Sequence, residues 1–184
     1  MNGKMGAGRE MARGTAQNYY KVKEKVAKAR GDDIPVHFKH AREIAHTIKL
    51  MHVKRAKSFL VHVTQKKEAV PYRRFKGGIG RHPQGKVWKW AQCGWPVKAA
   101  KVFLDLIRNA EGNARKNQLK TKLCVISHIK VNRAAISHRR MYRAHGRINH
   151  FNKSPCHIEL ILTEDKKQVP KAKEVPKKET ALVK

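Results

Sequence analysis

The feature of this sequence that most constrains its fold is a long stretch without acidic residues. From Gly112 to Ile158 there is no Asp or Glu, and residues 132–153 also have little apolar content. A segment with one sign of charge and no apolar side gains nothing from packing into a core. It is flanked by Leu123–Val131 and His157–Thr163, two apolar segments typical of strands. The pattern predicts a long β-hairpin whose distal half leaves the body of the protein.

The rest of the sequence supplies helices and further constrains the strands. Apolar residues recur at helical spacing in three segments, which predicts helices over His37–Met51, Val53–Lys67 and Pro96–Lys116. Alternation along the two strands predicts which side chains share one face of each strand. These are Val125, Ile129 and Val131 in the first strand, and Ile158, Leu160 and Leu162 in the second.

The predicted organisation is one domain with two tails, as expected for 184 residues. Residues 1–33 mix Gly and Ala with Lys and Arg and are interpreted as a basic N-terminal arm. The domain spans 34–165, with a breaker-rich loop insertion at 69–95 and the extended hairpin at 132–156. Residues 166–184 have low complexity, which predicts a disordered tail.

The net charge limits the partners of the chain. Lys and Arg number 43 against 13 Asp and Glu, which gives a formal charge of +30. Self-repulsion at this density disfavours a compact free monomer, and a polyanion relieves it while releasing its own counterions. Nucleic acid fits better than a membrane surface, because the basic residues are not confined to one side of an amphipathic helix.

Membrane insertion and export are not expected from this sequence. No apolar run approaches the roughly 20 residues of a membrane span, and the first thirty residues lack the apolar centre of a signal peptide. The three cysteines are too scattered for a disulfide framework and indicate reduced thiols in a cytosolic protein.

The predicted hairpin carries the first group of candidate binding residues. Arginine suits phosphate because its planar fork makes two hydrogen bonds at once and also stacks on bases. Tyrosine and phenylalanine in the same segment can stack on unpaired bases. The alternative, a merely solvated basic loop, is disfavoured by the length and single sign of the run. The candidates for RNA or DNA contact here are Arg133, Arg139, Arg140, Tyr142, Arg143, His145, Arg147 and Lys153.

The loop insertion carries the second group. Its cations alternate with Tyr72, Phe75, Trp88 and Trp90, so that basic groups can hold phosphates while aromatic rings offer stacking faces. For Trp95, beside the third helix, a place in the core and a place in the loop both remain open. The candidate RNA-binding cations of this loop are Arg73, Arg74, Lys76, Arg81, Lys86 and Lys89.

Enzyme-like motifs are present but incomplete. Residues 80–87 resemble a phosphate-binding P-loop, but Val87 stands where a Ser or Thr must reach the metal. A possible zinc set on the two strands lacks a CxxC pair, and its adjacent members Cys156 and His157 would point to opposite faces of a strand. Carboxylates are too sparse for general acid–base or two-metal chemistry. We expect no catalytic residues, no metal and no cofactor.

Several short stretches, in order along the chain, identify a known family. They are Val36–Lys39, Ala41–Glu43, Val70–Phe75, Gly78–Arg81, Trp95–Pro96, Asn109–Glu111, His128–Asn132, Tyr142–Asn149, Ser154–Leu160 and Leu162–Glu164. With these stretches, residues 28 to 165 resemble the universal large-subunit ribosomal protein family numbered twenty-two in bacteria and seventeen in the older eukaryotic series. Residues 1–27 and 87–95 depart from the family pattern, and the tail after Asp165 is shorter than in some relatives.

The resemblance implies a fold and a function. The implied fold class is α+β, a small helix-on-antiparallel-sheet domain with one long extended β-hairpin and basic, partly disordered termini. The implied function is that of a structural constituent of the large ribosomal subunit, which binds large-subunit ribosomal RNA and supports assembly. The hairpin tip would line the nascent-peptide exit tunnel, with wall residues Arg139, Arg140, Met141, Arg143, Gly146 and Arg147.

The resemblance also implies partners and a location. The partners would be large-subunit ribosomal RNA, neighbouring ribosomal proteins and the nascent polypeptide in transit. The protein would work on cytoplasmic ribosomes and pass through the nucleolus during assembly. Two rival classes share some features: a DNA- or chromatin-binding module, which should show a recognition helix or a minor-groove arm, and an RNA-processing enzyme.

Overall fold

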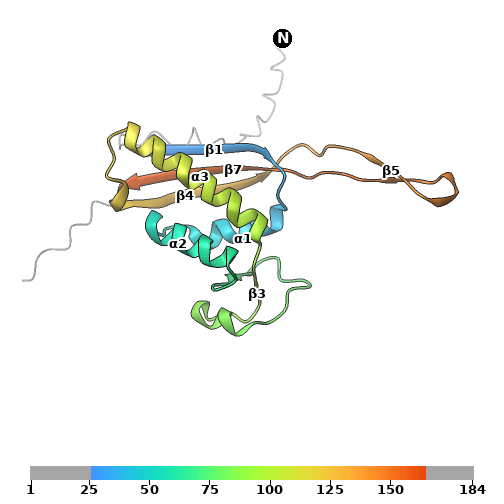
Figure 1. Cartoon of the computed structure of the whole chain (residues 1–184), viewed down its shortest axis with the longest axis horizontal. Helices are drawn as coiled ribbons and strands as arrows, with labels where there is room; N and C mark the ends of the chain where they lie inside the picture. Colours follow the sequence, from blue (N-terminus) through green and yellow to red (C-terminus); the bar gives the residue numbers. More distant parts are fainter. Residues whose placement is uncertain (1–25, 165–184) are drawn as a thin grey trace, which may run out of the picture.

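A three-stranded antiparallel sheet organises the fold in the computed structural model, which describes residues 26–164 (Figure 1). The central strand β7 (Cys156–Glu164) pairs with β1 (Val26–Ile34) on one side and with β4 (Cys124–Arg133) on the other. The predicted α+β class is confirmed. The hairpin that joins β4 to β7 extends far beyond the sheet (Figure 1).

The buried face of the sheet agrees with the prediction for β7 and differs for β4. Ile158, Leu160 and Leu162 are all buried, as alternation predicts. In β4 the expected face is correct for Ile129, which is buried, and for Val131, which is half-buried against the core. It is wrong for Val125, which is half-buried and does not belong to the core. The pairing register shifts between Ile126 and His128, and this bulge reverses the alternation along the strand. The side chains of β4 that are buried are Cys124, Ile126 and Ile129.

Strand β1 corrects the prediction of a basic arm over residues 1–33. Residues 26–33 are not part of an arm but form most of this edge strand. Its buried residues are Ala27 and Ala29, which alternate with Lys28 and Arg30. Small alanines give a weak hydrophobic signal, so the strand was missed. The remainder of the predicted arm and the predicted tail lie outside the described residues.

Three helices complete the core (Figure 1). The longest, α3 (Val97–Lys116), packs against β1 and β7, while α1 (Phe38–Ile48) packs against β4. Helix α2 (Val53–Thr64) packs against α3. Side-chain amides from α3 also hold the edge strand: Asn113 donates to the Lys28 carbonyl at 2.8 Å, and Asn117 donates to the Val26 carbonyl at 2.9 Å.

The first helix ends earlier than predicted because its C-terminal corner pairs with the sheet. It stops at Ile48 rather than Met51. Leu50 takes a left-handed conformation with φ of 64°, and its N–H donates to the Ile126 carbonyl at 2.9 Å. The Ile126 N–H donates in turn to the Met51 carbonyl at 3.0 Å. These two bonds replace the last turn of the predicted helix.

The other two helices are close to their predicted bounds. Helix α2 stops at Thr64 rather than Lys67, and Lys66 leaves the helix in a left-handed conformation with φ of 60°. Helix α3 begins at Val97, with Pro96 as its N-cap rather than its first residue. No helix in residues 26–164 is both long enough and apolar enough to cross a membrane.

The loop insertion at 69–95 is more regular than predicted. It opens with β2 (Val70–Pro71), which pairs with β3 (Cys93–Gly94) at its end, and it contains the 3-10 helix η2 (Pro83–Trp88). The short β2–β3 pair closes the insertion at its base. Figure 1 shows the loop as a separate lobe beside α1 and α2, away from the hairpin.

Candidate nucleic-acid interface

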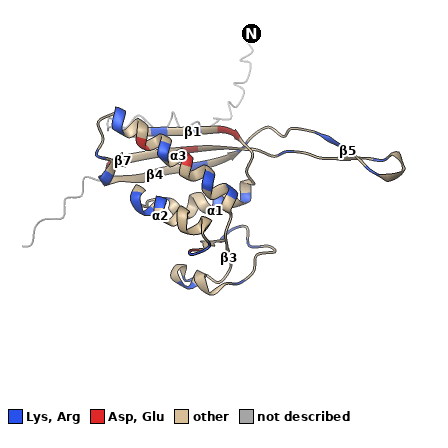
Figure 2. Ribbon diagram, in the orientation of Figure 1, with Lys and Arg blue, Asp and Glu red and all other residues tan. Residues whose placement is uncertain are grey.

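The hairpin projects its cations into solvent. Beyond the sheet, the two strands stay paired through a bridge between Ser137 and Lys153, and then through β5 (Arg140–Tyr142) and β6 (Ile148–His150). Every residue from 135 to 154 is exposed. Figure 2 shows basic residues along this projection and no acidic ones. A projection of this length buries nothing of its own, so its side chains are available to a partner.

The hairpin has two distinct faces. Residues directly opposite each other in an antiparallel pair point to the same side. Tyr142 therefore shares a face with Ile148, and Arg140 shares that face with His150. The opposite face carries Met141 and Asn149.

Most of the arginines lie on the second face. The Arg143 N–H donates to the Arg147 carbonyl at 2.8 Å, which pairs these two arginines next to Met141. The Phe151 N–H donates to the Arg139 carbonyl at 2.7 Å, so the strand pairing continues to Arg139. Arg139 is two residues from Met141 and therefore lies on the same face. Of the predicted tip arginines, three thus share one face, and Arg140 lies on the other beside the exposed ring of Tyr142.

The turn at the tip depends on left-handed backbone. His145 has φ of 59° and Gly146 has φ of 68°. They belong to the short 3-10 turn η4 (Ala144–Gly146), which closes the hairpin. Glycine adopts this conformation without steric cost, whereas His145 adopts it at some cost.

In the loop, the aromatic residues have a different role from the predicted one. Tyr72 is buried, at 3% exposure, so its interpretation as a stacking face was wrong. Trp88 packs edge-on against Phe59 of the core at 5.5 Å between ring centroids, and its indole N–H donates to the Ala69 carbonyl at 3.0 Å. The Trp90 indole N–H donates to the Tyr72 carbonyl at 2.8 Å. These rings hold the loop against the body.

The sequence left open whether Trp95 lies in the core or in the loop, and the structure places it in the loop. Its ring lies against His82 at 4.6 Å between centroids, and its indole N–H donates to the Gln84 side chain at 2.9 Å. The candidate cations of the loop are all exposed. They are Arg73, Arg74, Lys76, Arg81, Lys86 and Lys89.

Glu43 fixes the first part of the basic loop. This carboxylate is fully buried, and it accepts hydrogen bonds from the backbone N–H groups of Arg73, Arg74 and Phe75, each at 3.1 Å. The Arg42 guanidinium donates to it as well, at 3.1 Å. Burial alone would raise the pKa of Glu43, but these four donors outweigh it and hold the pKa below its ordinary value.

A cluster of cations and rings joins the loop to the root of the hairpin. Phe75 is surrounded by Lys39, Arg42 and Arg74, whose charged groups lie 5.8, 6.0 and 5.6 Å from the ring centroid. Phe75 also meets Phe38 edge-on, with centroids 6.1 Å apart. The Arg133 guanidinium at the root of the hairpin lies over the Phe38 ring at 5.0 Å. We call Phe38, Lys39, Arg42, Arg74, Phe75 and Arg133 the aromatic–cation cluster.

The sequence alone indicated three of the six members of this cluster as binding candidates: Arg74, Arg133 and the ring of Phe75. It missed Phe38 and Lys39, because they were assigned to the start of a helix. The sequence of residues 37–40 does mix an aromatic ring with basic side chains, as the loop does, and this mixture could have indicated a binding site. Only the fold shows that these residues stand beside the hairpin.

The enzyme-like motifs have other structural explanations. Gly85 of the P-loop-like stretch is buried, and an added Cβ would lie 2.0 Å from the Trp90 carbonyl oxygen. This glycine permits close backbone packing, and it lies within the 3-10 helix η2 rather than in a loop before a phosphate-binding α-helix. Cys124 and Cys156 lie at opposite ends of the β4–β7 pair, so they cannot share one ion. Within residues 26–164, no three His, Cys, Asp or Glu side chains gather as metal ligands.

The fold and the exposed cationic hairpin define a class of small basic α+β protein, and comparison with known proteins gives the family. The family model of ribosomal protein L22p/L17e matches residues 29–163. Large ribosomal subunit protein uL22 of Phlebotomus papatasi is 53% identical over 148 residues, 80% of each chain. The protein of the same name from Carabus granulatus is 52% identical over 157 residues, 85% of this chain and 86% of the relative.

A fungal relative is similar to the same extent. Large ribosomal subunit protein uL22 of Aspergillus fumigatus is 51% identical over 157 residues, 85% of this chain and 81% of the relative. The chain belongs to the ribosomal protein L22p/L17e family. This is a family of ribosomal structural proteins and not of enzymes.

Proposed function

We propose that the protein is a structural constituent of the large ribosomal subunit that binds large-subunit ribosomal RNA and supports subunit assembly. Family membership supports the assignment to the large subunit. The observation that carries RNA binding is the acid-free hairpin, exposed at every residue from 135 to 154. Neutralising phosphates with these cations releases condensed counterions, which supplies most of the binding energy.

The proposed RNA-binding surface has three parts. The hairpin supplies its arginines, Tyr142, His145 and Lys153, and the loop supplies its exposed lysines and arginines. The aromatic–cation cluster lies between them and adds ring faces to the positive charge. A chain of RNA that follows the hairpin to its root would meet this cluster next.

We further propose that the distal end of the hairpin lines the nascent-peptide exit tunnel. Its two-faced character suits this position: the face with Arg139, Arg143 and Arg147 can hold RNA phosphates, while the face with Arg140, Tyr142 and Ile148 can meet the lumen. Neighbouring ribosomal proteins and the nascent polypeptide would be the remaining partners. The protein would act on cytoplasmic ribosomes after nucleolar passage.

The assembly role is tested by reversing charge at the hairpin. We expect Arg139→Glu with Arg143→Glu to reduce incorporation into large subunits at least severalfold, because two phosphate-facing charges become repulsive. Sucrose-gradient profiles of subunits from cells that express the variant as sole copy would measure this. Lys98→Glu with Lys101→Glu on exposed positions of α3 gives the same change in net charge and should incorporate normally.

Two outcomes would count against the proposal. Equal incorporation of the hairpin variant and the α3 control would show that the hairpin charges do not contribute to subunit assembly. Recovery of the wild-type chain with chromatin rather than with ribosomal subunits at high salt would favour the rival DNA-binding class.

A further inference from the structure

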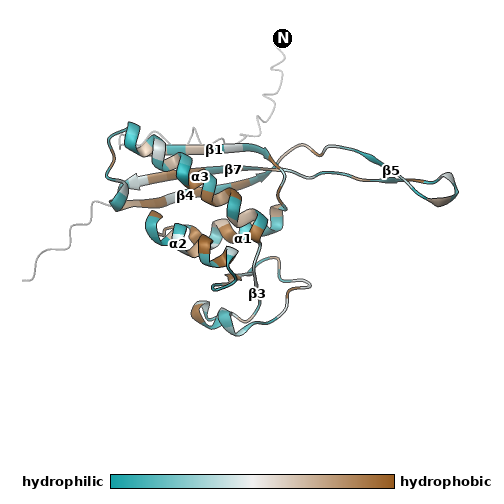
Figure 3. Cartoon of the chain, viewed as in Figure 1, coloured by the Kyte–Doolittle hydropathy of each residue, from teal (hydrophilic) through white to brown (hydrophobic). Residues whose placement is uncertain are grey.

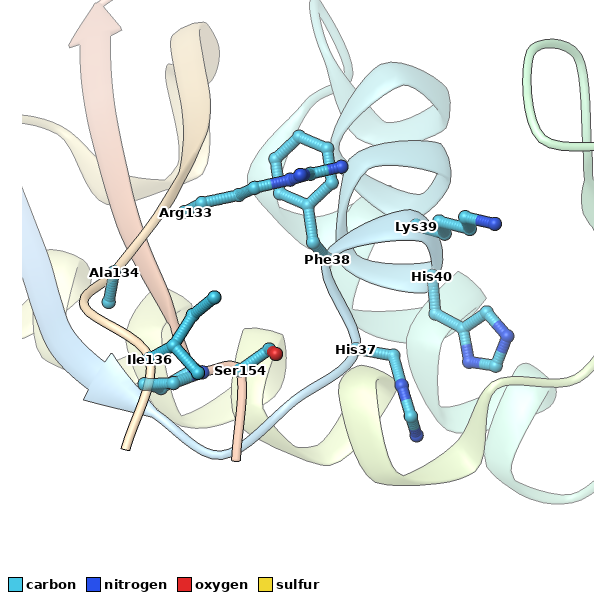
Figure 4. A pocket seen from close by; sticks show the side chains of 9 residues that line it. His37, Phe38, Lys39, His40, Arg133, Ala134, Ile136 and Ser154 are labelled. Carbon is cyan, nitrogen blue, oxygen red and sulfur yellow. The ribbon is translucent and has the colours of Figure 1, made fainter. Parts of the chain in front are cut away.

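A pocket of about 540 Å³ lies at the root of the hairpin (Figure 4). On one side the start of α1 supplies His37, Phe38, Lys39 and His40. On the other side the two hairpin strands supply Arg133, Ala134, Ile136, Ser154 and Pro155. Figure 4 shows the Arg133 side chain reaching across to the Phe38 ring, with Ile136 and Ser154 facing His37. The Phe38 ring and the Arg133 guanidinium therefore form one end of the pocket. Polar and apolar side chains, such as Ser154 and Ile136, form the rest of its wall.

The walls of this pocket are held in place from both strands. The Ala134 N–H donates to the Pro155 carbonyl at 3.0 Å and so fixes the two strands at the opening. The buried Cys156 thiol donates to the Val36 carbonyl at 3.1 Å and ties the hairpin root to the segment that precedes α1. The pocket thus lies where the folded body meets the exposed projection, which supplies Ile136 and Ser154.

The chemistry of the lining selects one kind of ligand. Four of the nine lining residues are Lys, Arg or His, and none is acidic, so the ligand should be an anion. The remaining lining is a phenylalanine ring with small or aliphatic side chains, so the ligand should also carry a flat apolar part. Ligand pockets commonly span roughly 300–1,000 Å³, which includes this one.

His37 and His40 lie on the same wall of this site, with ring centroids 5.5 Å apart. Burial lowers the pKa of His40, and the neighbouring His37 lowers it further. A neutral imidazole has one donor and one acceptor nitrogen, so it can pair with the edge of a base without adding charge.

We propose that this pocket binds a single unstacked nucleotide of an RNA strand, with the base against the Phe38–Arg133 stack and the phosphate toward Lys39 and His37. The inference rests on the proposed function, since it assigns one subsite of an RNA-binding surface. Unpaired bases that leave an RNA stack are recognised in this way, on aromatic rings and guanidinium planes. The hairpin would then grip RNA along its length, and the pocket would fix its register at the root.

The test fills the pocket without removing charge. Ser154→Trp places an indole at the opening, and Ser137→Trp places the same indole on the hairpin outside the pocket; both serines are exposed. Nuclear magnetic resonance of the full chain, titrated with adenosine 5′-monophosphate, would follow the Phe38 ring and Ile136 methyl signals. Inorganic phosphate is titrated in a parallel arm. Filter binding would measure affinity for large-subunit ribosomal RNA.

We expect adenosine monophosphate to shift both signals in the wild type and in Ser137→Trp, but not in Ser154→Trp. The affinity of Ser154→Trp for ribosomal RNA should fall roughly tenfold, as for the loss of one stacked base. Equal shifts with inorganic phosphate would overturn the proposal, because the pocket would then be only an anion site. Unchanged signals together with equal ribosomal RNA affinity of the two variants would overturn it and leave the proposed function standing. If the wild type itself failed to bind the RNA, the proposed function would fail with it.

Discussion

At the scale of single residues, one buried carboxylate sets the position of a basic surface. Glu43 lies on α1, yet its hydrogen bonds go to three consecutive backbone N–H groups of the loop, from Arg73 to Phe75. These bonds direct the Arg73 and Arg74 side chains outward while their backbone is fixed to the body. An acidic residue thus presents two cations to a polyanionic partner without meeting that partner itself.

Replacing Glu43 by Gln should lower the free energy of unfolding at pH 7 by about 2 kcal/mol, because one amide oxygen cannot replace a charged acceptor of three N–H bonds. The pKa of Glu43 is lowered from 4.5 in the folded protein. Its contribution is therefore complete above about pH 4.5 and is lost as pH falls through the folded pKa. Urea unfolding of both proteins at pH 7 and at pH 3 would measure this.

The matched control is Asp105→Asn, on the exposed surface of α3. Asp105 forms only an exposed ion pair with Arg108 at 3.2 Å, and such pairs contribute about 0–1 kcal/mol. The difference in free energy of unfolding between wild type and Glu43→Gln should be smaller at pH 3 than at pH 7. The difference between wild type and Asp105→Asn should be small at both pH values. A gap for Glu43→Gln that was independent of pH would contradict the assigned role of its charge.

At the scale of elements, the hairpin and the sheet share two strands but differ in what holds them. Strands β4 and β7 are fixed by the core, whereas the paired segments beyond Arg133 and Cys156 have only cross-strand hydrogen bonds. Figure 3 shows the same division, with mainly hydrophilic colours along the distal hairpin and apolar patches on α1 and α2. The hairpin is therefore stabilised little by the body and contributes little to it.

Shortening the hairpin should separate binding from stability. Joining residue 135 to residue 154 through Asn-Gly gives a two-residue turn that suits the twist of paired strands. We expect the melting temperature to change by only about 3 °C, because every removed side chain is exposed. Affinity for large-subunit ribosomal RNA should fall on the order of 100-fold, because several phosphate contacts are lost. Calorimetry and filter binding would measure the two effects, and loss of the folded core would show that the hairpin is needed for folding.

At the scale of the whole molecule, the charge of +30 acts against the free folded state. The sheet and helices bury a single continuous core, but cations surround it on helix surfaces, loop and hairpin (Figure 2). The Debye length falls from about 30 Å at 0.01 M salt to about 10 Å at 0.1 M, so long-range repulsion is screened over this range. A polyanion would act more strongly than salt, because it brings opposite charge to fixed positions.

The free chain should therefore become more stable as salt rises. We expect its melting temperature to increase by roughly 5 °C between low and moderate sodium chloride, as charge repulsion is screened. Differential scanning calorimetry in a series from 10 to 300 mM would measure it. A melting temperature that fell steadily with salt would show that attractive ion pairs outweigh repulsion in the folded state.

The class of the fold, the hairpin and the charge of the hairpin can all be predicted from local patterns of residues. The single-sign stretch and the flanking strands depend on local composition and alternation, which do not change with the way the elements pack. The tertiary structure decided what local patterns do not encode. It paired the alanine strand β1 with β7, reversed the alternation of β4 with a bulge, and buried Tyr72. It also brought Phe38 to Arg133, because a cluster of residues far apart in sequence exists only once the elements that carry them have packed.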